Sequence, residues 1–258
     1  MKKTELAGNL DTQLLKIAAF LCMIIDHAGV RIFPQIMEFR IIGRIAFPLY
    51  IWCMVAGACF TRCPWKYAMR LFLVGLVAQP CFILGLKHDW EHWNVFFTLF
   101  LGYLGIWGIR ENRWGSRYWA PVAAVIAASV VQMDYGWKGV MLILLMYLAR
   151  RERGSIIAVM IAFCLYWGAN TYAVTGFFGF SLKGGLFDWE ITKAFLRIQT
   201  FALLALPLIL WQRPQSRPFP KFWGYLAYPG HLLILWGIQL ALGMVTLEGS
   251  LKLLFPWT

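Results

Sequence analysis

The chain has 258 residues, of which 60% are hydrophobic and only 14% are charged, and its mean hydropathy is +0.64. A soluble domain is closer to half apolar and a quarter charged, so this composition excludes an ordinary soluble protein and indicates a membrane protein. The net charge of +12 does not indicate nucleic-acid binding, because the basic residues fall in short clusters between apolar runs, as topology determinants do.

Long apolar runs separated by short basic or Gly/Pro-containing loops predict an all-α fold, a polytopic transmembrane helix bundle of about nine spans. We expect the bundle to form a single integral-membrane domain over residues 1–258. The predicted spans are residues 12–32, 41–60, 68–86, 94–109, 118–133, 136–149, 154–169, 194–211 and 225–246. The third span is expected to break near Gln79-Pro80, and residues 171–192 could hide a re-entrant or tenth span. The last nine residues are too short to cross and are expected to lie in the membrane interface.

The distribution of charge predicts the orientation of these spans. Most of the 24 Lys and Arg residues fall at one set of span ends, while most of the 12 acidic residues fall at the other. Because basic loops stay on the cytoplasmic side, we expect a multi-pass protein of the bacterial cytoplasmic membrane with a cytoplasmic N-terminus. Asp26, His27, Arg40 and Arg44 then lie in the outer half of the membrane.

These four ionisable side chains lie in or beside the first two predicted spans. A charge at the centre of a membrane helix costs ~2.5–3.5 kcal/mol on insertion scales, so such groups usually face a cavity and have a function. The imidazole of His27 suits proton transfer, because its unperturbed pKa is near 6.5. Arg40 and Arg44 are four residues apart and share a helix face, which suits recognition of a phosphate, a carboxylate or an oxyanion.

Each of these residues also has a structural alternative. Asp26 and His27 could be a polar helix end, and Arg40 could be an interfacial arginine that reaches toward water. Neighbouring residues of a helix point about 100° apart, so Asp26 would orient His27 only indirectly, or pair with Arg31 or with an arginine of the second span. Gly43, between the two arginines, permits close helix approach.

Polar residues elsewhere carry weaker signals. Asn94 could be a helix N-cap or a donor to a substrate carbonyl, and Asp134 could be a turn residue or a binding group. His231 could be functional or only a packed polar side chain. His88 and His92 could hold zinc on a helix, but no third ligand is evident, and we expect no metal.

The order of these motifs resembles the TraX (F-pilin acetylase) family over nearly the whole chain. The Asp-His pair that ends the family's first helix matches Asp26-His27, and its Gly-Arg-x-Ala-Phe-Pro-Leu motif matches Gly43–Leu49. An Asn-x-x-Phe segment, a Tyr-Gly turn and a Tyr-x-x-His-Leu segment follow in the same order at Asn94–Phe97, Tyr135–Gly139 and Tyr228–Leu232.

One stretch departs from the pattern of the family. Many relatives carry a Glu-Gly pair and a His late in the second span, where this chain has Ala56-Gly57 and Cys59-Phe60. The departure bears on which acceptor the protein recognises.

The resemblance implies a membrane acyltransferase that takes an acetyl group from acetyl-CoA and gives it to a pilin N-terminus or another amine or hydroxyl acceptor. The chain is also similar to the wider set of transmembrane acyltransferases, which likewise combine a histidine in the membrane with an arginine-rich motif. Acetyl-CoA, pilin or another small or peptide acceptor, and membrane lipids are the expected partners, and nucleic acid is not expected. The alternatives are a transporter or flippase of an anionic substrate, bound by the two arginines, and an assembly chaperone without catalysis.

In the acyltransferase interpretation each polar group has a role. His27, with Asp26, supplies the base, and Arg44 and Asn94 stabilise the oxyanion or hold the thioester, with Arg40 nearby. Acetyl-CoA is made in the cytoplasm, so its long arm would thread through the bundle. The remaining binding residues are expected to be Arg62, Lys66 and Arg70, which would hold the donor's phosphates, together with Asp134 and His231.

The predicted topology is testable directly. A reporter fused after Arg151 should be cytoplasmic and one fused after Trp90 should be outside, because basic clusters stay on the cytoplasmic side. Paired alkaline phosphatase and fluorescent-protein fusions measure this. The reverse result at either position would contradict the nine-span arrangement.

Overall fold

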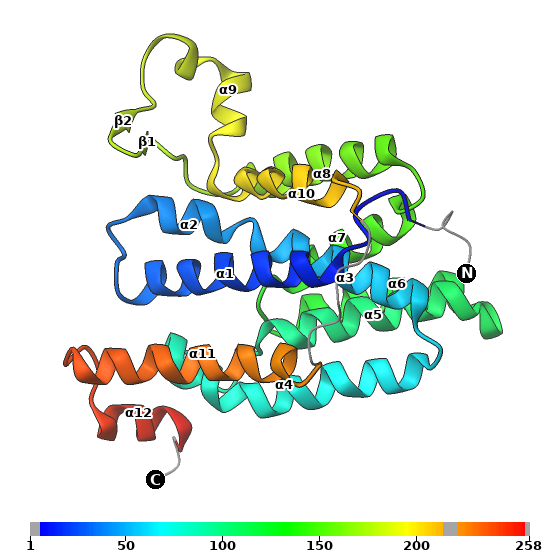
Figure 1. Cartoon of the computed structure of the whole chain (residues 1–258), viewed down its shortest axis with the longest axis horizontal. Coiled ribbons are helices and arrows are strands. Elements are labelled where there is room, and N and C mark those ends of the chain that lie inside the picture. Colours follow the sequence, from blue (N-terminus) through cyan, green and yellow to red (C-terminus); the bar gives the residue numbers. More distant parts are fainter. Residues whose placement is uncertain (1–5, 214–220, 256–258) are drawn as a thin grey trace. The chain divides into compact units, whose positions relative to one another are not determined.

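The computed structural model describes residues 6–213 and 221–255 (Figure 1). In the second of these ranges, side chains are described from residue 226 onward. Lys2, Lys3 and Arg217, which entered the charge distribution, lie outside the described residues. The described chain is mostly helical. The helices are α1 Thr12–Arg31, α2 Met37–Gly43, α3 Ala46–Phe60, α4 Pro64–Leu86, α5 Val95–Glu111, α6 Ser116–Val130, α7 Gly136–Ala149, α8 Arg153–Gly168, α9 Glu190–Phe195, α10 Leu206–Leu210, α11 Lys221–Ala241 and α12 Leu247–Leu254. The 3-10 segments are η2 Arg113–Gly115, η3 Gly185–Asp188 and η4 Ile198–Ala205, and the strands are β1 Gly176–Phe177 and β2 Phe180–Ser181.

Among the described residues, three helical segments are long and apolar enough to cross a membrane: Thr12–Arg31, Met37–Phe60 and Pro64–Leu86. The other apolar helical stretches, counted over residues with described side chains, are shorter: Gly136–Ala149, Arg153–Gly168, Ile198–Leu210 and Leu226–Ala241. At 1.5 Å per residue α7 extends about 21 Å, less than the ~30 Å of a hydrocarbon core. Association with a membrane therefore rests on these three helices, and the count of nine spans stays a prediction.

The observed helices differ from the predicted spans in four places. The second span begins earlier, at Met37, and is interrupted by a turn between α2 and α3. The third is continuous through Pro80 rather than broken there. The eighth is largely a 3-10 helix, η4, continued by the short helix α10. Residues 171–192 contain a short hairpin of the two-residue strands β1 and β2, then η3 and the start of α9. They contain no helix long enough to span a membrane.

The described chain groups into two compact units, and each is treated by itself. The first contains residues 1–53 and 149–218, and the second contains residues 54–148 and 219–258. The expectation of a single membrane domain over the whole chain stays a prediction.

In the first unit, α1 packs against α2, and η4 packs against both α2 and α8 (Figure 1). The segment between α8 and η4, residues 169–197, is called the excursion. Ile41 on α2 is buried against Val174 in the excursion and against Ile198 at the start of η4. The base of this excursion is closed by backbone hydrogen bonds from Val174 N to Leu196 O, 2.7 Å, and from Ile198 N to Tyr172 O, 3.1 Å. A hydrogen bond from the Phe178 amide to Glu38 Oε1, 2.6 Å, ties its hairpin to α2. The start of η4 is thereby fixed beside α2.

In the second unit, α4 packs against α5, α11 and α12, and α5 packs against α6. Local capping explains where several helices begin. Asn94 is the N-cap of α5 and accepts from the Phe96 amide at 3.0 Å, and Thr246 caps α12 by accepting from the Gly249 amide at 3.1 Å. Pro64 occupies the first turn of α4, where its missing N–H has no cost.

Two glycines allow α1 and α2 to approach closely. A Cβ atom at Gly29 would lie 2.6 Å from Phe39 Cβ, and one at Gly43 would overlap the side chain of Asp26. Any side chain at Gly43 would therefore push α2 away from α1 at the position where Asp26 contacts the arginines.

Replacement of Gly43 by alanine should destabilise the first unit by about 1–3 kcal/mol through overpacking, and should also weaken the contacts to Asp26. The matched control is Gly237→Ala, because no atom lies within 4 Å of a Cβ built at Gly237 on α11. Alanine is the better helix former there, so the control should be neutral or stabilising. Thermal unfolding in detergent measures both variants, and equal midpoints would contradict the packing argument.

Candidate active site

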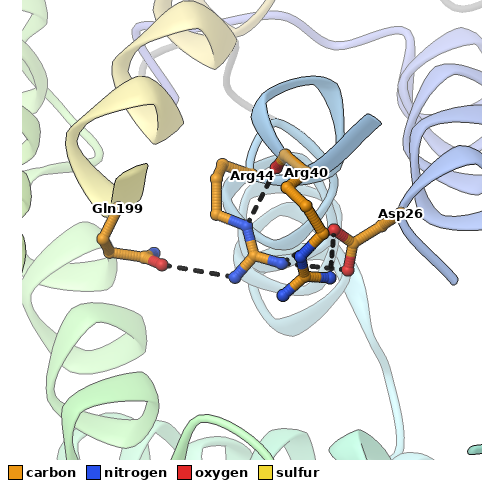
Figure 2. Close-up of polar contacts among 4 residues, drawn as sticks. All are labelled: Asp26, Arg40, Arg44 and Gln199. Atoms are coloured by element: carbon orange, nitrogen blue, oxygen red, sulfur yellow. Dashed lines mark hydrogen bonds and ion pairs between the residues drawn. The ribbon is translucent and has the colours of Figure 1, made fainter. Parts of the chain in front are cut away.

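The strongest polar cluster of the first unit centres on the carboxylate of Asp26 in α1 (Figure 2). Arg40 Nη1 donates to Asp26 Oδ1 at 2.7 Å, and Arg44 Nη2 donates to Oδ1 and Oδ2 at 2.8 and 2.9 Å. The two arginines come from α2 and its C-cap, one helical turn apart. As the sequence predicted, Arg40 and Arg44 share a helix face. Both donate to the same carboxylate, that of Asp26.

This cluster is largely withdrawn from solvent. The side chains of Asp26 and Arg44 are 11% and 12% exposed, and that of Arg40 is 27% exposed. One carboxylate faces two guanidinium groups, so one positive charge is in excess. Because an uncompensated charge is costly away from water, an anion or a developing negative charge would be stabilised here.

Arg44 is held on several sides. Besides Asp26, its Nε donates to Arg40 O at 3.3 Å, and its Nη1 donates to Gln199 Oε1 at 3.4 Å. Figure 2 shows its guanidinium between Gln199 on one side and Asp26 on the other. Each of its nitrogens therefore contacts a protein acceptor, which makes Arg44 an organiser of the cluster.

Arg40 contrasts with Arg44. Its one side-chain hydrogen bond to a described residue runs from Nη1 to Asp26, so Nε and Nη2 keep their donors available to a ligand or to water. The expected alternative, an arginine that reaches from the interface toward water, does not describe a guanidinium fixed on a buried carboxylate. Arg40 is the residue of the pair best placed to bind something else.

His27 follows Asp26 on α1 and is buried, with 9% of its surface exposed. Adjacent helical residues diverge by about 100°, so Asp26 serves the arginines while His27 presents a different face of α1. Of the sequence-predicted pairings for Asp26, the one with arginines of the second span is the one observed.

Gln199 belongs to this cluster and was not among the residues predicted from the sequence. It lies in the first turn of η4, is 6% exposed, and contacts Arg44 across a separation of 155 residues. The available signal was a polar Gln-Thr pair inside an otherwise apolar run, which by the cost of buried polar groups indicates a function.

Asn94 belongs to the second unit and is completely buried. Its Nδ2 donates to Gly75 O and to Gln79 Oε1, both at 2.8 Å, and its Oδ1 caps α5. Gln79 in turn donates to His92 O at 2.8 Å. The N-cap expectation is confirmed. With both amide donors engaged inside the protein, Asn94 joins α4 to α5, and a role as substrate donor stays only a prediction.

Asp134 also belongs to the second unit and lies in a turn, as one alternative predicted. Its Oδ1 lies 3.7 Å from His92 Nε2, and its backbone carbonyl accepts from the hydroxyl of Thr98. The Asp134 amide donates to Trp93 O at 2.9 Å, so this turn and the loop before α5 are joined.

His88 and His92 stack face to face with centroids 4.4 Å apart instead of converging on one point. No group of three His, Cys, Asp or Glu residues suited to a metal occurs in the described parts of the chain.

His231 lies inside α11, 8% exposed, with Nδ1 3.0 Å from Ala227 O. A carbonyl can only accept, so Nδ1 is the donor in this contact. The ring meets Tyr228 edge to face at 5.4 Å, and Tyr228 meets Phe96 at 5.0 Å. His231 is thus oriented by its own helix within the second unit.

The predicted cofactor cluster is an exposed basic surface of the second unit. Lys66 and Arg70 lie one turn apart on α4, with Arg70 Nε donating to Lys66 O at 3.2 Å and its guanidinium 5.5 Å from the Tyr67 ring centre. Arg62 is exposed in the preceding loop. Arg110 Nη1 donates to Ala58 O in the last turn of α3 and to Thr61 O in that loop, at 2.6 and 3.2 Å. Exposed cations of this kind suit phosphate groups.

Three helices long and apolar enough to cross a membrane place this chain among helical, membrane-associated proteins. Comparison of the sequence then gives the family. The model of the TraX protein family matches residues 11–239, so the chain belongs to the TraX family.

The chain is also similar to two curated proteins. The chain is 25% identical over 241 residues to the probable fimbrial assembly protein FimC, serogroup H1, of Dichelobacter nodosus, covering 86% of this chain and 92% of that protein. It is 28% identical over 148 residues to an uncharacterised protein of Rickettsia prowazekii (strain Madrid E), covering 55% of this chain and 57% of the relative. The match therefore spans little more than half of the Rickettsia protein. No solved structure matches.

The His92–Asp134 pair predicts a pH-dependent stability. Asp134 raises the pKa of His92 above its usual value of 6.5, against the opposing effect of burial. A raised folded-state pKa means that the stabilisation is complete below about pH 6.5 and is lost as the pH rises through the folded-state pKa. The His92→Gln and Asp134→Asn variants should both melt below the wild type at pH 5.5 and approach it at pH 9.

The control is Glu91→Gln, an exposed change in the same loop that leaves the pair intact. Thermal unfolding in detergent across this pH range measures all four proteins. A deficit in the two pair variants that does not change with pH would show that the pairing does not depend on protonated His92.

Proposed function

We propose that this protein is a membrane-embedded acyltransferase that moves an acetyl group from acetyl-CoA to an amine or hydroxyl acceptor on the outer side of the cytoplasmic membrane. The observation that carries the proposal is the cluster of Asp26, Arg40 and Arg44, which has one positive charge in excess and unused donors on Arg40. His27 adjoins the cluster on α1. Membership of the TraX family supports the same reaction.

Acyl transfer needs a base for the acceptor and donors for the carbonyl oxygen. The acceptor nitrogen attacks the thioester carbon, so a carbon–nitrogen bond forms while the carbon–sulfur bond breaks. His27 takes the proton from the attacking nitrogen and returns it to the departing thiolate. The carbonyl oxygen becomes negatively charged in the transition state, and Arg40, held in place by Asp26, stabilises it.

The role of Arg44 follows from its contacts. The sequence suggested Arg44, with Asn94, as an oxyanion donor, yet the nitrogens of Arg44 are engaged with Asp26, Arg40 and Gln199. We therefore assign Arg44 to positioning. It keeps the carboxylate of Asp26 aligned, and Arg40 supplies the donors to the reacting oxygen.

The donor's phosphates are proposed to bind the exposed cluster of Arg62, Lys66 and Arg70 on the cytoplasmic side. Such a contact would help to bind acetyl-CoA without changing the chemical step. Its long pantetheine arm would bring the thioester toward the outer half of the membrane, where the orientation inferred from charge places His27.

The acceptor is proposed to be a fimbrial or pilin subunit with a reactive amine. The support is the name of the Dichelobacter nodosus relative, a probable fimbrial assembly protein that covers most of this chain. The protein would be a multi-pass component of the bacterial cytoplasmic membrane with its N-terminus in the cytoplasm.

The proposal predicts that purified protein releases thiol from labelled acetyl-CoA when an acceptor is present. His27→Ala should lower turnover by ~10²–10⁴-fold, the usual contribution of a general base, while the protein still inserts and binds acetyl-CoA. His231→Ala should have a smaller effect, because the topology predicted from the sequence puts His231 nearer the membrane midplane and His27 in the outer half. Thiol release and label incorporation measure both.

Two results would contradict this assignment. An anion transporter would move its substrate without releasing thiol, so absence of thiol release with every acceptor tested would exclude the reaction. Retention of more than about a tenth of the turnover by His27→Ala, or a larger loss in His231→Ala, would show that His27 is not the base.

A further inference from the structure

Three segments of the first unit meet at the backbone of Ala7. The Ala7 amide donates to Arg150 O at 2.8 Å, and the Ala7 carbonyl accepts from Arg153 Nε at 3.3 Å and from Gln212 Nε2 at 3.1 Å. Arg150 and Arg153 lie at the turn before α8, and Gln212 follows α10. The N-terminal segment, dark blue in Figure 1, therefore fixes the turn before α8 beside the end of α10.

A second set of hydrogen bonds keeps the N-terminal segment in place. Asn9 is completely buried, and its amide donates to Ile209 O at 2.6 Å while its Nδ2 donates to Leu208 O at 2.9 Å. The indole of Trp52 donates to Asn9 O at 2.8 Å. The junction at Ala7 is thus a defined part of the first unit.

Exposed arginines with open donors lie at this junction. Arg151, Arg153 and Arg213 are all exposed, and none of them forms an ion pair with a carboxylate in the described parts of the chain. Arg153 uses only Nε in hydrogen bonds to described residues, so both of its Nη groups keep their donors. The guanidinium of Arg213 lies 4.8 Å from the centre of the Trp211 ring, which is 53% exposed.

The positive charge of the junction is not compensated locally. Residues 6–9, 150–155 and 208–213 contain four arginines and one acidic residue, Glu152, which gives a net charge of +3. Glu152 Oε2 accepts from the hydroxyl of Ser155 at 2.9 Å. The next acidic residue along the N-terminal segment, Asp11, is buried and caps α1 by accepting from the Leu14 amide. The junction therefore suits an anionic ligand.

We propose that this junction binds the phosphate headgroup of an anionic phospholipid in the cytoplasmic leaflet. The predicted spans 154–169 and 194–211 both end here, at the depth of the headgroups, on the side that the charge distribution makes cytoplasmic. Guanidinium groups match the geometry of phosphate oxygens, and basic sites between helix ends on this side suit anionic headgroups. An exposed tryptophan such as Trp211 is typical of the same membrane depth.

The alternative is that these arginines only set the orientation of the chain in the membrane. That role depends on the number of positive charges and not on their arrangement around Ala7. A headgroup site depends on the arrangement, because several donors must reach one phosphate. Removal of the same number of charges at the junction and elsewhere on the predicted cytoplasmic side separates the two roles.

The experiment titrates purified protein in nonionic detergent with short-chain phosphatidylglycerol, and with phosphatidylcholine of the same chain length as the neutral lipid. Native mass spectrometry gives the affinity, and thermal unfolding gives the stabilisation by lipid. The double variant Arg151→Gln with Arg213→Gln should bind phosphatidylglycerol about 30-fold more weakly, the usual contribution of two basic residues near an anionic lipid surface. The control, Arg113→Gln with Arg117→Gln, removes two exposed arginines of the second unit and should keep the wild-type affinity.

A third variant tests the arrangement with every charge retained. Trp211→Leu stays apolar but loses the ring under Arg213, so binding should weaken about 2–5-fold, as for an exposed cation–π contact. Wild-type binding should also weaken as salt is added, because exposed charges are screened. These two measurements decide the matter if the double variant does not insert.

Three results would overturn the proposal. Equal affinity of the wild type for the two lipids would show that the headgroup is not recognised, and equal losses in the junction and control variants would leave only a role in orientation. Displacement of phosphatidylglycerol by coenzyme A would assign the arginines to the donor's phosphates instead of a lipid. Because the readout is lipid binding, a failure to release thiol would overturn the proposed function and leave this site standing.

Discussion

The arrangement of the first unit depends on one buried carboxylate that binds two arginines. Asp26 accepts from Arg40 and Arg44 where water is largely excluded, and removing one partner of such a buried pair typically costs about 3–5 kcal/mol. Buried ion pairs are nevertheless weak stabilisers, because both charges lose their hydration. With two guanidinium groups on one carboxylate, the cluster carries one positive charge in excess.

The surrounding residues are organised to make this cluster possible. Gly29 and Gly43 let α1 and α2 come close enough for the carboxylate to reach both arginines. The excursion between α8 and η4 packs on α2 through Ile41. Backbone hydrogen bonds close the base of the excursion, so that Gln199 contacts Arg44 although 155 residues separate them. Packing, backbone hydrogen bonds and charge therefore meet at one place.

The second unit shows the opposite use of buried polar groups. Asn94 and Gln79 satisfy each other and nearby backbone groups, so their amides bind α4, α5 and the intervening loop together. Fully satisfied networks of this kind make a fold rigid. Asn94 therefore holds the second unit together, whereas in the first unit Gln199 contacts Arg44 through its Oε1.

The sequence by itself determined the helical membrane character, the group of ionisable residues in the first two predicted spans, and the position of Arg40 and Arg44 on one helix face. These follow from local periodicity and from the cost of placing charge in an apolar run. Tertiary structure alone decided that Asp26 binds both arginines, that Arg44 is engaged while Arg40 keeps open donors, and that Gln199 completes the cluster. It also showed that residues 171–192 form a tethered excursion and that the eighth predicted span begins as a 3-10 helix. A contact across 155 residues has no local signature, because it depends on which faces pack together and not on the pattern within either segment.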